Sequence, residues 1–177
     1  MGTGYTLRCK GCGYKISANL GIGFLFPMAY QEAMEAAREG KLGKTFQQFL
    51  QEHPDGALNI ESVFLQCPEC GTLESGPDLS MYIRNPDITR REHGRWSVPA
   101  PLEGADYVSP MELEQENTYI LYAPGHICEK CGKPIKSVTE NDLMERDAGA
   151  ENERGRTVIS CPCCGKPLWI DGVMMWD

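Results

Sequence analysis

The sequence predicts a small α+β fold built from short antiparallel β-hairpins, and two observations lead to it. Eight of the nine cysteines fall into four C-x-x-C-G pairs: CKGCG at 9–13, CPECG at 67–71, CEKCG at 128–132 and CPCCG at 161–165. A short β-prone stretch leads into each pair, whereas a helix-forming segment separates the first pair from the second. The β-prone stretches are 5–9, 62–67, 118–128 and 156–161.

Each cysteine pair has the features of a metal-binding turn. The two intervening residues let a tight turn aim both sulfurs at one point, and the glycine gives the backbone freedom to leave the turn. Two such turns make a tetrahedral four-sulfur site, which suits zinc or a single iron ion. The N-terminal residues show no secretory signal, so metal ligation explains nine cysteines better than disulfides do.

The four pairs resemble the rubredoxin-type knuckles of the zinc-ribbon superfamily. The resemblance covers the knuckles and their flanking strands, about half of the chain. It implies a fold of short hairpins stabilised by metal. It implies no single function, because zinc ribbons occur in transcription factors, ribosomal proteins, enzyme appendages and adaptors.

The spacing of the knuckles reads as two tandem ribbons. The first two knuckles are separated by 54 residues and the last two by 29. Sequential pairing therefore predicts one site made of Cys9, Cys12, Cys67 and Cys70 and a second made of Cys128, Cys131, Cys161 and Cys164. Nested pairing, first knuckle with fourth and second with third, is the alternative, and some chaperone zinc domains use it. Those domains carry C-x-x-C-x-G-x-G, whose glycines are missing here.

The domain boundary is expected near residue 95, which gives a first ribbon over 1–95 and a second over 96–177. Residues 84–104 lose hydrophobic periodicity and gain proline and arginine, as linkers do. After the last knuckle, PLWIDGVMMW is expected to form a strand, a turn around Asp171-Gly172, and a second strand.

A helical hairpin is predicted as an insertion in the first ribbon, over about 27–53. Pro27 suits a first helical position, and the first helix should end at Gly40. Thr45 with Gln48 reads as a capping box that opens the second helix. Its apolar residues are expected to pack in a core: Phe46, Phe49 and Leu50.

The second ribbon is predicted to contain one short helix over about 138–146. Ser137 and Glu140 form the capping box that would open it. Ser109-Pro110 followed by Glu112 predicts one more helical turn before the strand at 118.

Two structural Zn²⁺ ions are the predicted cofactors, with iron as the alternative. The CGY at 12–14 resembles the first knuckle of rubredoxins, but the last knuckle reads CGK and its gap lacks the aromatic cluster that packs beneath their iron. All four knuckles are complete, so no open coordination position indicates a catalytic metal. We identify no catalytic residues, and His126 is expected to be a loop histidine.

The composition limits the partners. A net charge of −8 argues against a general nucleic-acid coat protein. Two structural zinc ribbons without catalytic residues are expected to act as a protein-interaction or regulatory adaptor. A nucleic-acid-binding accessory factor is the alternative. Because no apolar run approaches the length of a membrane span and no signal sequence is evident, a cytoplasmic location is expected. The residues that would contact nucleic acid lie in the linker: Arg84, Arg90, Arg91, Arg95 and Trp96.

Cys163 is the ninth cysteine, and it lies between the two ligands of the last knuckle. Gly11, Glu69 and Lys130 occupy the same position in the other knuckles, so this position accepts varied side chains. Cys163 is therefore expected to be an exposed free thiol, serving either as a redox-sensitive switch or as an incidental surface cysteine.

Overall fold

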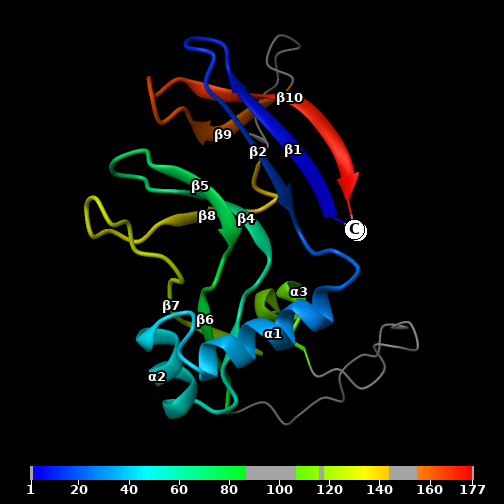
Figure 1. Ribbon diagram of the computed structural model, residues 1–177, viewed down its shortest axis with the longest axis vertical. Coiled ribbons are helices and arrows are strands. Elements are labelled where there is room, and N and C mark those ends of the chain that lie inside the picture. Colours follow the sequence, from blue (N-terminus) through cyan, green and yellow to red (C-terminus); the bar gives the residue numbers. More distant parts are fainter. Residues whose placement is uncertain (1, 87–106, 116–117, 144–154, 177) are drawn as a thin grey trace. The chain divides into compact units, whose positions relative to one another are not determined.

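The computed structural model describes residues 2–86, 107–115, 118–143 and 155–176 (Figure 1). The contacts divide the chain into two compact units. Unit 1 comprises 1–23, 61–78 and 126–177, and unit 2 comprises 24–60 and 79–125. Each unit contains segments from both sides of residue 95, and the predicted boundary lies outside the described residues. All four cysteine pairs belong to unit 1.

The first sheet of unit 1 has the strand order β2-β1-β10-β9. These strands are β1 (Gly2–Cys9), β2 (Lys15–Leu20), β9 (Arg156–Ser160) and β10 (Pro167–Trp176). Strands β1 and β10, blue and red in Figure 1, pair antiparallel along the whole of β1, from Gly2 opposite Trp176 to Cys9 opposite Leu168. The two ends of the chain therefore meet in the middle of one sheet.

The turn predicted at Asp171-Gly172 is a β-bulge instead. Thr6 lies opposite Gly172 and Leu7 lies opposite Ile170, which leaves Asp171 as the extra residue. Strand β1 continues on both sides of this point, so β10 keeps its direction and absorbs one residue. The segment is thus one long strand, not a hairpin.

Two glycines in β1 provide space for large side chains from β10. A Cβ atom added to Gly4 would lie 2.6 Å from Met174 Cγ, and one added to Gly2 would overlap the ring of Trp176. The Trp176 indole N–H donates to the carbonyl oxygen of Leu20, 3.2 Å away on β2. Trp176 and Met174 therefore lie across the backbone of β1 and fix the register of the pair.

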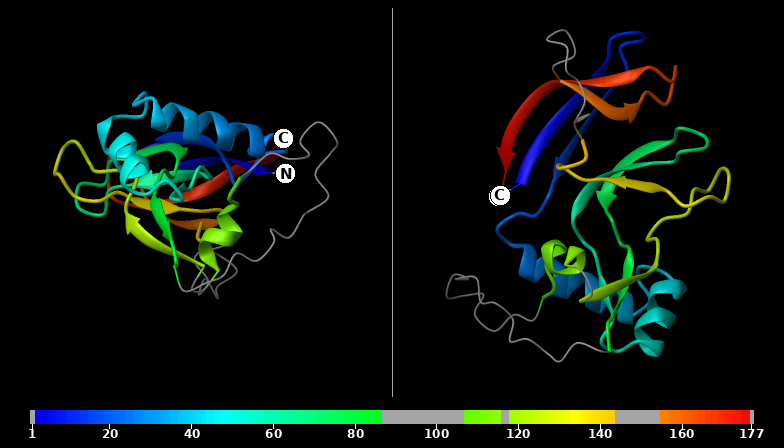
Figure 2. Two further views of the ribbon diagram at one scale, coloured as in Figure 1. Left: turned by 90° about the horizontal axis from the view of Figure 1, so that it is seen from below. Right: turned by 180° about the vertical axis from the view of Figure 1, so that it is seen from behind.

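The second sheet of unit 1 has the order β5-β4-β8, with β4 (Ser62–Gln66), β5 (Leu73–Pro77) and β8 (Lys136–Val138) (Figure 2). The helix predicted over about 138–146 is wrong in its described part, because Val138 pairs with Phe64 in β8 and residues 139–143 form a turn. Glu140 lies in a turn and accepts a hydrogen bond from the Tyr5 hydroxyl at 2.9 Å. Strand pairing thus overrides a local helix signal.

One buried core joins the two sheets of unit 1. It includes Phe64 of β4 and Val138 of β8 together with residues of β1, β2, β9 and β10, and two of the cysteines belong to it. The full set is Leu7, Cys9, Leu20, Phe64, Val138, Leu143, Ile159, Cys161 and Leu168. The core therefore packs directly behind sulfur-bearing side chains.

Unit 2 contains the predicted helical hairpin, formed by α1 (Phe26–Arg38) and α2 (Lys44–Glu52). Pro27 lies in the first turn of α1 as predicted, and Gly40 follows the helix with φ +77°. The prediction that α2 has an apolar core face is also confirmed. Its buried residues are Phe46, Phe49 and Leu50.

The rest of unit 2 is a sheet of order β3-β6-β7 and a short helix. The elements are β3 (Ala57–Leu58), β6 (Met81–Arg84), β7 (Tyr119–Ala123) and α3 (Pro110–Glu114). The capping box of Ser109 and Glu112 at α3 is confirmed. The capping box of Thr45 and Gln48 is wrong, because α2 begins one residue earlier and the Gln48 amide bonds Glu52.

Candidate metal centres

The four cysteine pairs adopt the same backbone turn. In each knuckle the N–H of the first cysteine donates to the carbonyl five residues later, at 2.8 or 2.9 Å. The N–H of the trailing glycine donates back to the first cysteine's carbonyl, at 2.8 to 3.0 Å. Because these bonds recur in all four knuckles, each knuckle presents its two sulfurs in the same way.

The trailing glycines have positive φ, between 67° and 77°. Residues with a Cβ atom rarely adopt this conformation, so the glycine is required by the backbone. A Cβ added at any of these positions would meet no atom within 4 Å, which shows that the requirement comes from φ and not from space. The four glycines are Gly13, Gly71, Gly132 and Gly165.

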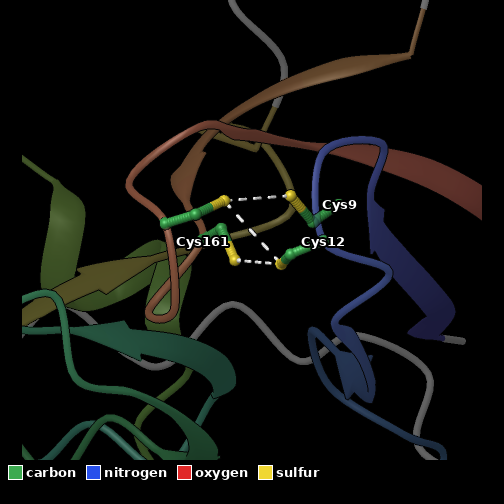
Figure 3. A group of neighbouring side chains, drawn as sticks. Cys9, Cys12 and Cys161 are labelled. Atoms are coloured by element: carbon green, nitrogen blue, oxygen red, sulfur yellow. Dashed lines mark hydrogen bonds between the residues drawn. The ribbon is translucent and has the colours of Figure 1, made fainter.

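The first knuckle meets the fourth. Their sulfur atoms form cluster A, which consists of Cys9, Cys12, Cys161 and Cys164 (Figure 3). Cys9 Sγ lies 3.5 Å from Cys164 Sγ, and Cys12 Sγ lies 3.5 Å from Cys161 Sγ. The first cysteine of each knuckle is buried and the second is exposed. Cluster A therefore has one side against the core and one toward solvent.

The second knuckle meets the third in the same manner. Their sulfur atoms form cluster B, which consists of Cys67, Cys70, Cys128 and Cys131. Cys67 Sγ lies 3.4 Å from Cys131 Sγ, and Cys70 Sγ lies 3.5 Å from Cys128 Sγ. Again the first cysteine of each knuckle is buried and the second is exposed.

The sulfur positions have the dimensions of a tetrahedral metal site. All four sulfurs of each cluster lie within 4.8 Å of one another, and the closest pairs lie 3.4–3.7 Å apart. A tetrahedron with metal–sulfur bonds of about 2.3 Å has edges of about 3.8 Å. Disulfide sulfurs, in contrast, are about 2.0 Å apart. Either cluster can therefore hold a metal ion with four thiolate ligands.

The sequential pairing predicted from the knuckle spacing is wrong, and the nested alternative describes the structure. Cys9 and Cys12 group with Cys161 and Cys164, not with Cys67 and Cys70. The physical reason is strand pairing. Strand β1 leads into the first knuckle and β10 leaves the fourth, so their pairing brings those knuckles together. Pairing of β4 with β8 does the same for the second and third knuckles.

Two thiols have pKa values that favour the metal-binding thiolate. The backbone N–H of Cys12, helped by that of Gly11, lowers the pKa of Cys9 to about 6. In cluster B the Thr72 hydroxyl, with Oγ1 3.1 Å from Cys70 Sγ, lowers the pKa of Cys70 to about 6. Each cluster thus contains one thiol that loses its proton readily at neutral pH.

The remaining shifted thiols hold their protons more firmly. At Cys12 the backbone N–H of Tyr14 lowers the pKa, but the neighbouring Cys161 sulfur and burial outweigh it and raise the pKa to about 12. At Cys131 the N–H of Lys133 is outweighed in the same way by Cys67 and burial, and the pKa rises to about 12. A second thiolate beside the first is unfavourable unless a cation neutralises the pair. A bound cation therefore favours the state in which all four cysteines of a cluster are thiolates.

Two lysines of the cluster A knuckles pack across the site. Lys10 Nζ lies 3.2 Å from the centre of a Trp169 ring, a cation–π contact between the first knuckle and β10. The aliphatic part of Lys166 covers Gly11, where an added Cβ would lie 2.7 Å from Lys166 Cδ. Each of these two knuckles thus contributes a lysine that packs on the opposite hairpin.

The other predicted residues have simpler surroundings. Cys163 is exposed and belongs to neither four-sulfur group. His126 is no ligand in either group, and its Nε2–H donates to the Pro77 carbonyl at 2.8 Å. Of the linker residues only Arg84 is described, at the end of β6. The others lie outside the described residues: Arg90, Arg91, Arg95 and Trp96.

Sequence reasoning missed three residues that support the clusters. Thr72 directly follows the trailing glycine of the second knuckle. A hydroxyl so close in sequence to Cys70 could have been recognised as a hydrogen-bond partner of its sulfur. Trp169 and Gln66 gave no local signal, because their partners lie elsewhere in the chain.

No protein-family model matches this chain, and neither the curated proteins nor the solved structures include one that is significantly similar to it. Within the described ranges, no helix has both the length and the apolar character needed to cross a bilayer.

Proposed function

We propose that this chain is a zinc protein whose two four-cysteine clusters are closed structural sites, and that it acts as a protein-interaction or regulatory adaptor. One observation carries the metal-binding part: the two tetrahedron-sized groups of sulfurs, each supplied by two identical knuckles. A complete set of four protein ligands leaves no position for water or substrate, which is typical of structural zinc.

Zinc is favoured over iron by the surroundings of the clusters. Rubredoxin-like iron centres pack on an aromatic cluster, whereas the buried core beside cluster A is aliphatic apart from Phe64 and two cysteines, with Tyr5 and Tyr14 packed at its edge. Zinc has no redox chemistry, so its role here is to hold the hairpins together. The third possibility is an iron electron-transfer protein, which would absorb visible light, whereas a zinc protein would be colourless.

Metal analysis of the purified chain tests this proposal. Native mass spectrometry should find two zinc ions per chain, and the protein should not absorb visible light. A red protein that contains iron would contradict the zinc assignment and support the rubredoxin-like alternative. A chain without bound metal after purification and after zinc addition would contradict both.

The adaptor role is supported by apolar side chains on exposed sheet positions. In unit 1, Val173, Met174 and Met175 of β10 are each about three-fifths exposed. In unit 2, β7 stands last in its sheet order and exposes Ile120, Leu121 and Tyr122. Large apolar side chains exposed on a sheet are typical of surfaces that bind another protein.

Affinity capture with matched variants tests the adaptor role. The Leu121→Glu and Met175→Glu variants each place a charge on one exposed strand, and at least one should lose partners that the parent captures from cells. Glu114→Gln, at an exposed position of α3, is the control and should keep them. Unchanged capture by both strand variants would contradict the proposed surfaces.

A nucleic-acid-binding role is the second candidate, and the basic rim of cluster A favours it. Arg8, Lys10, Lys15 and Lys166 each lie within three residues of a cluster A ligand in sequence, and Lys10 stacks on Trp169 while Lys15 pairs with Asp171. Together with the linker arginines they would contact phosphates and bases. Salt-dependent binding of a single-stranded oligonucleotide, lost on replacing Arg90, Arg91 and Arg95, would support this role. Absence of binding at low salt would exclude it.

A cytoplasmic location is part of the proposal. A reducing compartment keeps the eight cysteines available as thiolates, whereas an oxidising one would convert such closely spaced thiols into disulfides. Localisation of the tagged chain in its native cell tests this point.

A further inference from the structure

The side chain of Gln66 joins the two clusters. Its Nε2–H donates to the Ser160 carbonyl at 2.6 Å, and its Oε1 accepts from the Ser160 N–H at 3.0 Å. Gln66 directly precedes Cys67 of cluster B, and Ser160 directly precedes Cys161 of cluster A. A two-point hydrogen-bonded bridge therefore connects residues adjacent to a ligand of each cluster.

The geometry of this bridge makes it sensitive to both knuckles. The Gln66 amide pairs with a peptide N–H and C=O as a neighbouring strand would, and it joins β4 to β9, which belong to different sheets. Because one planar amide makes both bonds, a shift of either strand weakens both at once. The bridge forms only when the two knuckles are placed together.

Strand β4 is also held to the first sheet at its other end. Ser62 exchanges two backbone hydrogen bonds with Gly21, at 2.9 and 3.1 Å. Between these attachments, the side chain of Phe64 is fully buried in the core that contains Cys9 and Cys161. The strand that leads into cluster B thus packs behind the buried ligands of cluster A.

We propose that the two metal sites are thermodynamically coupled, and that Gln66 is a positioning residue that transmits the coupling. The inference rests on the proposed function, that both clusters bind metal. An ion at cluster B would fix the second knuckle and with it Gln66. The Gln66 amide would then position Ser160 and the fourth knuckle, which begins at Cys161. Metal affinity at cluster A is then higher when cluster B is filled, and linkage requires the same factor in the other direction.

Cobalt titration of site-isolated variants measures the coupling. Cys70→Ser/Cys131→Ser disables cluster B, and Cys12→Ser/Cys164→Ser disables cluster A. Each double variant changes only exposed cysteines. The visible absorption of thiolate-bound Co²⁺ reports the affinity of the remaining site. We expect each site to bind about tenfold more weakly when the other is disabled, with equal factors in both directions.

The role of Gln66 is tested by repeating both titrations in a Gln66→Met background, which keeps side-chain length without the amide. Each lost hydrogen bond corresponds to roughly a two- to tenfold change, so the coupling factor should fall toward one while two ions still bind. Gln66→Asn, too short to span the gap, should act in the same way if the methionine variant folds poorly. Gln48→Met is the control, because Gln48 bonds Glu52 within α2 of unit 2.

The outcomes separate the two levels of the proposal. Two ions that bind with a coupling factor of one would overturn the coupling and leave the proposed function standing. Reciprocal coupling that survives both Gln66 variants unchanged would overturn the role of Gln66. A chain that binds fewer than two cobalt ions would overturn the proposed function, and the coupling with it.

Discussion

Cys9 Sγ lies 3.5 Å from Cys164 Sγ, although 155 positions separate the two residues in sequence. A metal ion at cluster A therefore joins the two ends of the described chain. Closing so long a loop costs conformational entropy, which the metal–thiolate bonds and the pairing of β1 with β10 offset. The two ends of unit 1 and its metal site are thus expected to form together.

Removal of metal should loosen unit 1 and leave unit 2 helical. A closed zinc site contributes about 10–16 kcal/mol of apparent binding free energy, and both clusters lie in unit 1. In a Trp96→Phe background the remaining tryptophans, Trp169 and Trp176, report on unit 1. A strong chelator should shift their fluorescence toward that of solvated indole, while the far-UV circular dichroism of α1 and α2 persists. Simultaneous loss of both signals would contradict the prediction that unit 2 stays folded when unit 1 loses its metal.

Replacement of Cys163 by serine should leave two metal ions per chain. The Cys163 side chain is exposed and outside both four-sulfur groups, so its loss removes no ligand. We expect an unchanged zinc content and a change in the free energy of unfolding within about 0.5 kcal/mol. Metal content by mass spectrometry checks this, with Cys164→Ser as the matched variant that should weaken one site. Loss of a zinc from Cys163→Ser would show that the ligand assignment is incorrect.

A valine in place of Gly4 should destabilise the pairing of β1 with β10. Its side chain would collide with Met174, whose Cγ lies 2.6 Å from the added Cβ position. Overpacking of this kind costs about 1–3 kcal/mol. Urea unfolding followed by tryptophan fluorescence measures the loss, and Gly76→Val in β5 is the matched control, because a Cβ added there would lie 4.0 Å from its nearest neighbour, Leu65 Cδ1. Equal stability of the two variants would rule out the contact with Met174 as a constraint.

Unit 2 should lose stability in alkali because of Tyr30. Burial, the largest effect, raises the pKa of this hydroxyl above its ordinary value of 10.0. The native state therefore retains the proton more strongly than the unfolded chain. The resulting stabilisation is complete below pH 10.0 and is lost as the pH rises toward the folded-state pKa, by at most about 1.4 kcal/mol per pH unit.

Tyr30→Phe removes this dependence. Urea unfolding of the helical signal at pH ~8 and pH ~11 should show a smaller drop for the variant than for the parent. Tyr122→Phe, at a half-exposed position, is the control and should behave as the parent does. An identical drop in the parent and in Tyr30→Phe would assign the alkaline sensitivity to another group.

Several local features of the fold were predictable from local sequence. The four knuckles, the strands that lead into three of them, the α1–α2 hairpin and the capping box at Ser109 each depend on residues within one turn, strand or helix pair. A C-x-x-C-G pair specifies its own turn because the glycine, the backbone hydrogen bonds and the sulfurs are all within six residues.

The grouping of the knuckles depends on contacts that no local pattern reveals. Nothing in the local sequence around Gly2 and Gly4 indicates that they fit Trp176 and Met174. Asp171-Gly172 reads as a turn until β1 is known to pair across it. Four similar knuckles along the chain suggest a tandem repeat with sequential pairing. Which sulfurs actually meet is decided by strand pairing between distant segments, β1 with β10 and β4 with β8.

The most direct test of the nested metal sites is the tight zinc content of two crossed double variants, measured against a competing chelating dye. Both change only exposed cysteines. Cys12→Ser/Cys164→Ser removes two ligands from cluster A, whereas Cys12→Ser/Cys70→Ser removes one from each cluster. We predict that the first variant keeps one tightly bound zinc and the second keeps none. One tight zinc in Cys12→Ser/Cys70→Ser and none in Cys12→Ser/Cys164→Ser would contradict the nested arrangement and restore the sequential one.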